Sequence, residues 1–227
     1  MDDVSWEATN DLNEMLDAIQ GKVSERKLRL FACACIRSLW VSIGQNMSPY
    51  TMVNDAESFA DFSDQNQGRR MHSIRVALYH TMEVSRRYHD DAATLSRFRA
   101  EQSLFKKDAW EAAREVQRAV EIAVVAAARP EEAQEFDHII RQDMANLLRD
   151  IIGNPYFPIY FLPNWQSTEA VALATTVYQG RTFDLLPQLG NIIENSGCSE
   201  STILNHCRSC GQHVRGCWII DMVLNKQ

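Results

Sequence analysis

The sequence predicts an all-α protein, in which a helical bundle is followed by a smaller C-terminal helical lobe. Apolar residues recur at helical intervals through most of the 227 residues, and Gly and Pro are scarce, with 9 and 6 copies. Hydrophobic residues make up 45% of the chain and charged residues 23%, which is globular rather than disordered composition. Six cysteines without a secretory leader are typical of reduced thiols, so we expect a cytoplasmic protein.

Six helices are expected in the bundle, which we assign to residues 1–153. They should cover residues 11–20, residues 25–43, a segment opened by Ser48 and Pro49, residues 69–90, residues 104–128 and a segment that ends at residue 152. Ser24 is a suitable N-cap for the second of these helices. The fifth carries a row of alanines, and small side chains let a neighbouring helix approach closely. We therefore expect the fifth helix at the centre of the bundle.

An extended strap is expected over residues 154–166. Its sequence NPYFPIYFLPNW contains three prolines and five aromatic residues, which is incompatible with a continuous helix. Phe157 and Phe161 should be buried, because exposing so much aromatic area to water is unfavourable. Three further rings should keep an exposed edge, since their polar atoms tolerate a wet rim, and they are the candidate partner-binding residues: Tyr156, Tyr160 and Trp165.

The remaining residues, 167–227, should form the C-terminal lobe. Its expected helices cover residues 168–179, 182–186, 187–196, 199–206 and 213–224. A lobe of this size has little core of its own, so we expect it to pack on the bundle.

Three sequence motifs resemble those of an uncharacterised bacterial helical family. They are GKVSERKLRLFACACIRSLW over residues 21–40, LLRDIIGNPYFP over residues 147–158 and HCRSCGQHVRGCWIIDMVLNK over residues 206–226. The resemblance implies a shared helical fold and no particular activity. The chain departs from the family at Cys210, where members often have another residue.

A cluster of cysteine and histidine near the C-terminus is a candidate zinc site. Cys207, Cys210, His213 and Cys217 supply four nitrogen and sulfur ligands, the number that a tetrahedral zinc ion requires. If residues 213–224 are helical, His213 and Cys217 lie one turn apart. The spacing matches no common zinc-finger pattern, and Cys217 also falls on an apolar helix face. We therefore expect no cofactor, with zinc as the alternative, and we expect Cys35 and Cys217 to be buried.

A basic segment between Arg69 and Lys107 is a candidate nucleic-acid-binding surface. It contains nine lysines and arginines against four acidic residues, in a chain whose net charge is −7. On a helix, several of its cations fall on one side: Arg69, Arg75, Arg86 and Arg87. Such a stripe can contact phosphates, or acidic helices of the same fold can cover it.

No sequence motif points to catalysis. The chain contains no phosphate-binding loop, no nucleophile elbow and no zincin motif. The longest apolar run, residues 122–128, is too short to cross a bilayer, so no membrane association is expected. We therefore expect a non-catalytic interaction or accessory protein that docks another protein through its strap and C-terminal lobe. The two alternatives are a nucleic-acid-associated protein and a zinc-binding protein.

Overall fold

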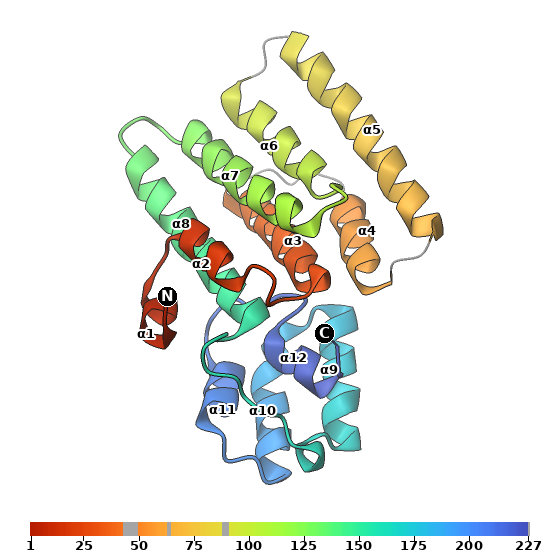
Figure 1. Ribbon diagram of the computed structural model, residues 1–227, viewed down its shortest axis with the longest axis vertical. Helices are drawn as coiled ribbons and strands as arrows, with labels where there is room; N and C mark the ends of the chain where they lie inside the picture. The colour runs from red at the N-terminus through yellow and green to blue at the C-terminus, as the bar shows by residue number, and fades with distance from the viewer. Residues whose placement is uncertain (43–49, 63–64, 88–90, 227) are drawn as a thin grey trace. The chain divides into compact units, whose positions relative to one another are not determined.

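The fold is all-α, as the sequence predicts. The computed structural model describes residues 1–42, 50–62, 65–87 and 91–226, and the segment around Ser48 and Pro49 lies outside them. The described residues form twelve α-helices, two short 3₁₀ helices and no β-strand (Figure 1). None of these helices is long and apolar enough to cross a membrane.

The chain divides into two compact units, Met1–Leu147 and Leu148–Gln227. The first unit contains α1 (Asp3–Ala8), α2 (Leu12–Ile19), α3 (Glu25–Ser42), α4 (Tyr50–Asp61), α5 (Gln65–Arg87), α6 (Ala92–Ser103), α7 (Ala109–Ala127) and most of α8 (Ala133–Ile152). The second unit begins in the last turns of α8. It continues through η1 (Pro163–Trp165), α9 (Thr168–Gly180), η2 (Phe183–Leu185), α10 (Leu186–Asn195), α11 (Ser201–Arg208) and α12 (Trp218–Val223).

Helix α7 lies at the centre of the first unit, where it packs against α3 and α6 (Figure 1). Five of its alanines are buried, including Ala112, Ala119 and Ala123, and their small side chains allow both neighbours to approach. Helix α3 turns an almost continuous run of residues inward, and the buried thiol of Cys35 confirms the sequence prediction for that residue.

Helix α6 lies where the sequence predicted no helix, and the helix expected over residues 104–128 begins only at Ala109. Both helix starts are set by aspartates whose side chains accept backbone N–H groups, Asp91 from Thr94 at 2.7 Å and Asp108 from Glu111 at 2.8 Å. The apolar pattern of α6 is weak because polar side chains share its buried face. Glu101 is one of them, and it accepts hydrogen bonds from Trp40 and Arg97, each at 3.2 Å.

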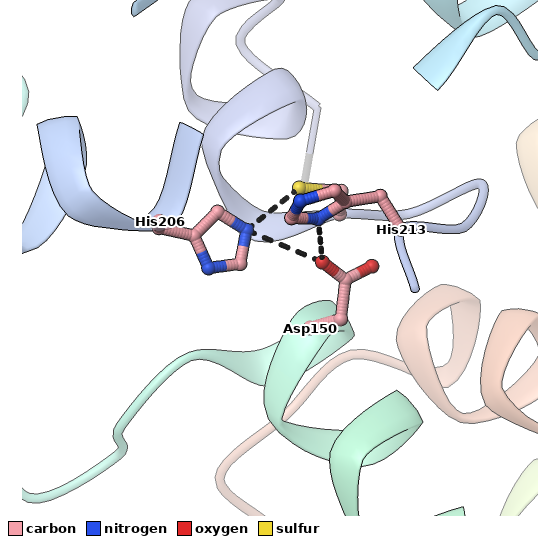
Figure 2. A group of neighbouring side chains, drawn as sticks. Asp150, His206 and His213 are labelled. Atoms are coloured by element: carbon pink, nitrogen blue, oxygen red, sulfur yellow. Dashed lines mark hydrogen bonds and ion pairs between the residues drawn. The ribbon is translucent and has the colours of Figure 1, made fainter. Parts of the chain in front are cut away.

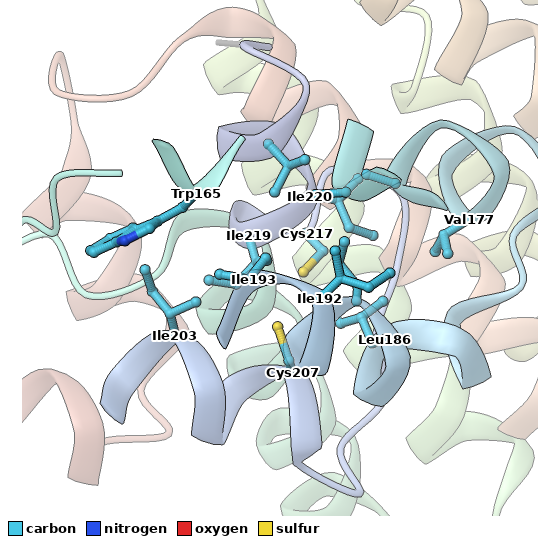
Figure 3. Close-up of a cluster of buried hydrophobic side chains, with 14 of the residues drawn as sticks. Trp165, Val177, Leu186, Ile192, Ile193, Ile203, Cys207, Cys217, Ile219 and Ile220 are labelled. Atoms are coloured by element: carbon cyan, nitrogen blue, oxygen red, sulfur yellow. The ribbon is translucent and has the colours of Figure 1, made fainter. Parts of the chain in front are cut away.

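The core of the second unit is formed by α9, α10, α11 and α12 around one apolar cluster (Figure 3). The thiols of Cys207 and Cys217 lie inside this cluster, which confirms the predicted burial of Cys217. Helix α12 is shorter than the predicted helix over residues 213–224, since it begins only at Trp218. His213 therefore lies in the loop before it, and Cys217 is the N-cap residue.

The predicted strap, residues 154–166, has no helix before η1. Phe157 is 57% exposed, so its predicted burial is wrong, and Tyr160 is 81% exposed. Trp165 is only 8% exposed, because η1 turns the chain and directs the indole into the core of the second unit. Phe161 is half-buried and meets Trp165 edge to face, with ring centroids 5.6 Å apart.

Gly190 allows the close packing of α10 on α11. A Cβ atom at this position would lie 2.8 Å from Cβ of Cys207, which is attached to the backbone and cannot rotate away. We expect Gly190→Ala to lower the free energy of unfolding, since overpacking of about 1–3 kcal/mol exceeds the helix-propensity gain of up to about 1 kcal/mol. Urea unfolding measures this. The matched control is Gly180→Ala, where the nearest atom is at 3.5 Å and no loss is expected. Equal stabilisation by both substitutions would contradict the packing.

Candidate metal centre

Asp150 lies at the centre of a group of buried and partly buried side chains in the second unit (Figure 2). It occupies the last turns of α8, and its side chain is 4% exposed. The carboxylate accepts the backbone N–H of Val214 at Oδ2, 2.9 Å away, which fixes its orientation. Its other oxygen, Oδ1, lies 2.7 Å from Nδ1 of His213 and 3.2 Å from Nε2 of His206.

Two features of the chain bring this carboxylate to the loop before α12. Gly153 ends α8 with φ of +73°, a conformation that favours glycine, and its N–H donates to the carbonyl of Arg149. Its missing Cβ also leaves room for the indole of Trp218, since an added Cβ would lie 3.3 Å from the ring. Trp218 directly follows Cys217, so the thiol is positioned beside Asp150.

His206 comes from the last turn of α11 and makes contacts through both ring nitrogens. Its Nε2 lies 3.2 Å from Sγ of Cys217 and 3.2 Å from Oδ1 of Asp150. Its Nδ1 accepts the indole N–H of Trp218 at 3.1 Å. In this tautomer Nε2 carries the proton, which it directs at the carboxylate and the thiol.

His213 closes the group from the loop between α11 and α12. Its ring lies 4.8 Å from that of His206, and its side chain is 7% exposed. Its Nε2 is 3.3 Å from Oγ of Ser209, a hydroxyl that also donates to the carbonyl of His206 at 2.9 Å. The loop is therefore tied both to the end of α11 and to Asp150.

The four side chains together form a compact set of donor atoms. One ligand atom from each of Asp150, His206, His213 and Cys217 lies within 4.8 Å of every other. Bond lengths of about 2.0–2.3 Å in tetrahedral zinc sites place neighbouring ligand atoms about 3.3–3.6 Å apart. To admit an ion, the shortest distances in the group, 2.7 and 3.2 Å, must lengthen slightly, and the longest, up to 4.8 Å, must shorten by about 1 Å.

The electrostatics of the group are those of a buried anion. Burial alone would raise the pKa of Asp150, but hydrogen bonds from His206 and His213 outweigh it and lower the pKa. Burial, and next the charge of Asp150, raise the pKa of the Cys217 thiol well above its ordinary value. Without a cation beside it, Cys217 therefore remains a neutral thiol.

The structure brings together only part of the zinc set expected from the sequence. His213 and Cys217 belong to the group, whereas Cys210 is exposed and Cys207 lies in the apolar core. Burial raises the pKa of Cys207 to about 12, so its thiol stays protonated. The other two members of the group, Asp150 and His206, were missed as ligands. Asp150 lies in the motif LLRDIIGNPYFP and His206 in the motif HCRSCGQHVRGCW.

The candidate nucleic-acid-binding arginines all lie on α5, and all four are exposed: Arg69, Arg75, Arg86 and Arg87. Arg86 forms an ion pair with Glu83 of the same helix at 3.4 Å. Among the described side chains, α7 and α8 supply no acid that forms an ion pair with Arg75, Arg86 or Arg87. At these three arginines, acids of α7 and α8 therefore do not neutralise the stripe through ion pairs.

Comparisons with known proteins gave no matching family, curated protein or solved structure. We therefore infer function from the geometry and chemistry of the side chains themselves.

Proposed function

We propose that this is a non-catalytic helical protein whose second unit is held together by a structural metal ion of the zinc class. The ligands are Oδ1 of Asp150, the ring nitrogens Nε2 of His206 and Nδ1 of His213, and Sγ of Cys217. The observation that carries the proposal is the convergence of one ligand atom from each of these four side chains within 4.8 Å of one another.

Charge balance favours a divalent ion at this place. With both histidines neutral, the Asp150 carboxylate and a Cys217 thiolate carry two negative charges, which one divalent ion neutralises. Metal binding requires the thiolate, and a bound cation supplies the stabilisation that burial otherwise denies it. A thiolate with two imidazoles selects zinc over magnesium or calcium, which prefer oxygen ligands.

Burial favours a structural site over a catalytic one. Four protein ligands complete a tetrahedral shell, whereas catalytic zinc keeps a position open for water. The ligands come from the end of α8, the end of α11 and the loop before α12, and the side chains of Asp150 and His213 are almost inaccessible. An ion bound here would join three separate segments of the second unit.

Zinc content provides the direct test. We expect about one zinc ion per chain to remain bound through gel filtration, and a chelator to remove it and lower the melting temperature. His206→Ala and Cys217→Ser should lose the ion, while Cys210→Ser, which changes an exposed thiol, should retain it. Failure of the intact protein to take up zinc, or equal loss in Cys210→Ser, would contradict the proposal.

Trp218 offers an optical signal for the same event. Coordination through Nε2 of His206 moves the ring proton to Nδ1, which then cannot accept the indole N–H of Trp218. Addition of zinc to the chelated protein should therefore change the tryptophan emission. Trp218→Phe should remove that change and leave the emission of the other four tryptophans.

A second candidate role is docking of a partner protein, as the sequence suggested. Three large apolar side chains of the strap are exposed: Phe157, Tyr160 and Leu162. Of the expected docking residues, Tyr160 belongs to this surface, Tyr156 is half-buried and Trp165 is buried. Exposed apolar groups that are close in the chain favour such a role, which depends chiefly on Tyr160.

A further inference from the structure

A cavity in the first unit lies outside the candidate metal centre. Its volume is about 730 Å³, and its lining comes from α5, α6, the loop after α6 and the start of α7. Figure 1 shows α5 and α6 side by side, with α6 next to α7. A cavity of this volume falls within the range of about 300–1,000 Å³ that is usual for small-molecule sites.

The charged side chains that line the cavity are mainly cationic. Four basic side chains, Arg75, Arg86, Arg99 and Lys106, line it together with one acidic side chain, Glu115. Lys106 donates to Glu115 at 2.5 Å, a hydrogen bond that raises the pKa of the lysine. The single acid of the lining is therefore already satisfied within the fold.

Two arginines of the lining remain available to a ligand. Among the residues that the structure describes, no carboxylate lies within 4.0 Å of Arg75 or Arg99, and both side chains are exposed. Arg86 has only an exposed pair with Glu83 at 3.4 Å, and such pairs are weak. Guanidinium groups match phosphate oxygens with two parallel hydrogen bonds, so the cavity suits a phosphate-bearing ligand.

An aromatic ring lies between the cations of α5. Tyr79 lines the cavity and is 48% exposed, and Val76 beside it is 40% exposed. Arg75, Tyr79 and Arg86 share one face of the helix, with the two arginines about 16 Å apart along its axis. A flat exposed ring flanked by phosphate-binding groups is the arrangement on which single-stranded nucleic acids stack their bases.

We propose that this cavity binds a nucleoside phosphate, either as a free nucleotide or as part of a single-stranded nucleic acid. Arg75 and Arg99 contact the phosphates, Arg86 extends the cationic wall, and Tyr79 stacks with a base. The cavity lies wholly in the first unit, so the test of this proposal does not depend on whether the second unit binds a metal ion. Exposed arginine and tyrosine side chains can be replaced there without disturbing the core.

Fluorescence anisotropy with a labelled oligothymidylate tests the proposal on the full chain. We expect binding at low ionic strength that weakens with salt, because each contacted phosphate contributes about −0.7 to the slope of log K against log salt. Arg75→Ala and Arg99→Ala should each weaken binding severalfold. Tyr79→Ala should weaken it by about 5- to 150-fold, the range for loss of one stacked base.

Arg87→Ala is the matched control. Arg87 is an exposed arginine of α5 that does not line the cavity, so its loss should leave binding nearly unchanged. Circular dichroism should show the same melting temperature for all variants. Competition by thymidine monophosphate would assign a mononucleotide pocket, and competition by unlabelled oligothymidylate alone would assign a strand. Both results support the proposal.

Three results would overturn it. The first is no binding of the oligothymidylate at low salt. The second is an equal effect of Arg87→Ala and Arg75→Ala, which would mean that general charge attraction is responsible. The third is displacement by polyglutamate or by inorganic polyphosphate as effective as that by oligothymidylate, because neither competitor carries a base for Tyr79.

Discussion

Replacing Asp150 by alanine is expected to lower the free energy of unfolding by about 3–5 kcal/mol, the usual loss when one partner of a buried charged network is removed. The substitution leaves His206, His213 and the N–H of Val214 without their acceptor in a site from which water is largely excluded. Urea unfolding of the zinc-saturated protein measures the loss. Asp184→Ala is the control: this acid is exposed in the same unit, and surface substitutions rarely exceed about 0.5 kcal/mol.

The same variant separates a metal centre from a buried ion pair without metal. If Asp150 ligates zinc, its replacement also removes the ion, so the loss should be smaller when both proteins are measured after chelation. If the carboxylate only accepts hydrogen bonds from the histidines, the loss should be the same with and without chelator. Asp150→Asn, which keeps the size and one acceptor oxygen, should still lose zinc because the charge is gone. An effect of Asp150→Ala as small as that of Asp184→Ala would contradict both interpretations.

The candidate metal centre shows why local sequence patterns predicted only two of its four candidate ligands. His213 and Cys217 were chosen because they are four residues apart in an expected helix, but the structure places His213 in a loop and Cys217 at the N-cap of α12. They converge because the loop is bound to Asp150 through Val214. Asp150 precedes His213 by 63 residues, and spacing within a motif carries no information about such a contact.

The helices of the first unit also differ in whether a local sequence pattern predicts them. Helices α3 and α7 were predictable, because apolar and small residues recur along them at helical intervals. Helix α6 was not, since its buried residues are Ala100, Glu101 and Ser103, and its start depends on the Asp91 cap rather than on an apolar stripe. Two residues of the cavity lining lie here, Arg99 in α6 and Lys106 just after it. The stripe predicted from the sequence lies on α5 and therefore contained only one wall of the cavity.

The strap shows the limit of composition as a guide to burial. Its prolines and aromatic rings indicated an irregular, apolar segment, but they did not indicate which rings turn inward. The side chain of Trp165 is directed inward by η1, which begins with Pro163, whereas Phe157 and Tyr160 precede that turn and remain exposed. The direction of each ring depends on the backbone path, and residue type alone does not specify it.

Trp165→Ala is accordingly expected to lower the free energy of unfolding by about 3–5 kcal/mol, the range for truncation of a buried aromatic residue. The indole is 8% exposed, contributes to the core of the second unit and supports Phe161 edge to face. Thermal and urea unfolding of the full chain provide the measurement.

Tyr160→Ala is the matched control, since Tyr160 is an aromatic residue of the same strap that is 81% exposed. Its replacement should leave stability within about 0.5 kcal/mol of the unchanged protein. If a protein partner docks on this surface, Tyr160→Ala should reduce its binding at unchanged stability, because exposed aromatic side chains often dominate interface energies. Trp165→Ala should instead reduce binding only to the extent that it unfolds the second unit. A large loss of stability from Tyr160→Ala would mean that the ring is covered within the chain, and the strap would then be part of the core rather than a docking surface.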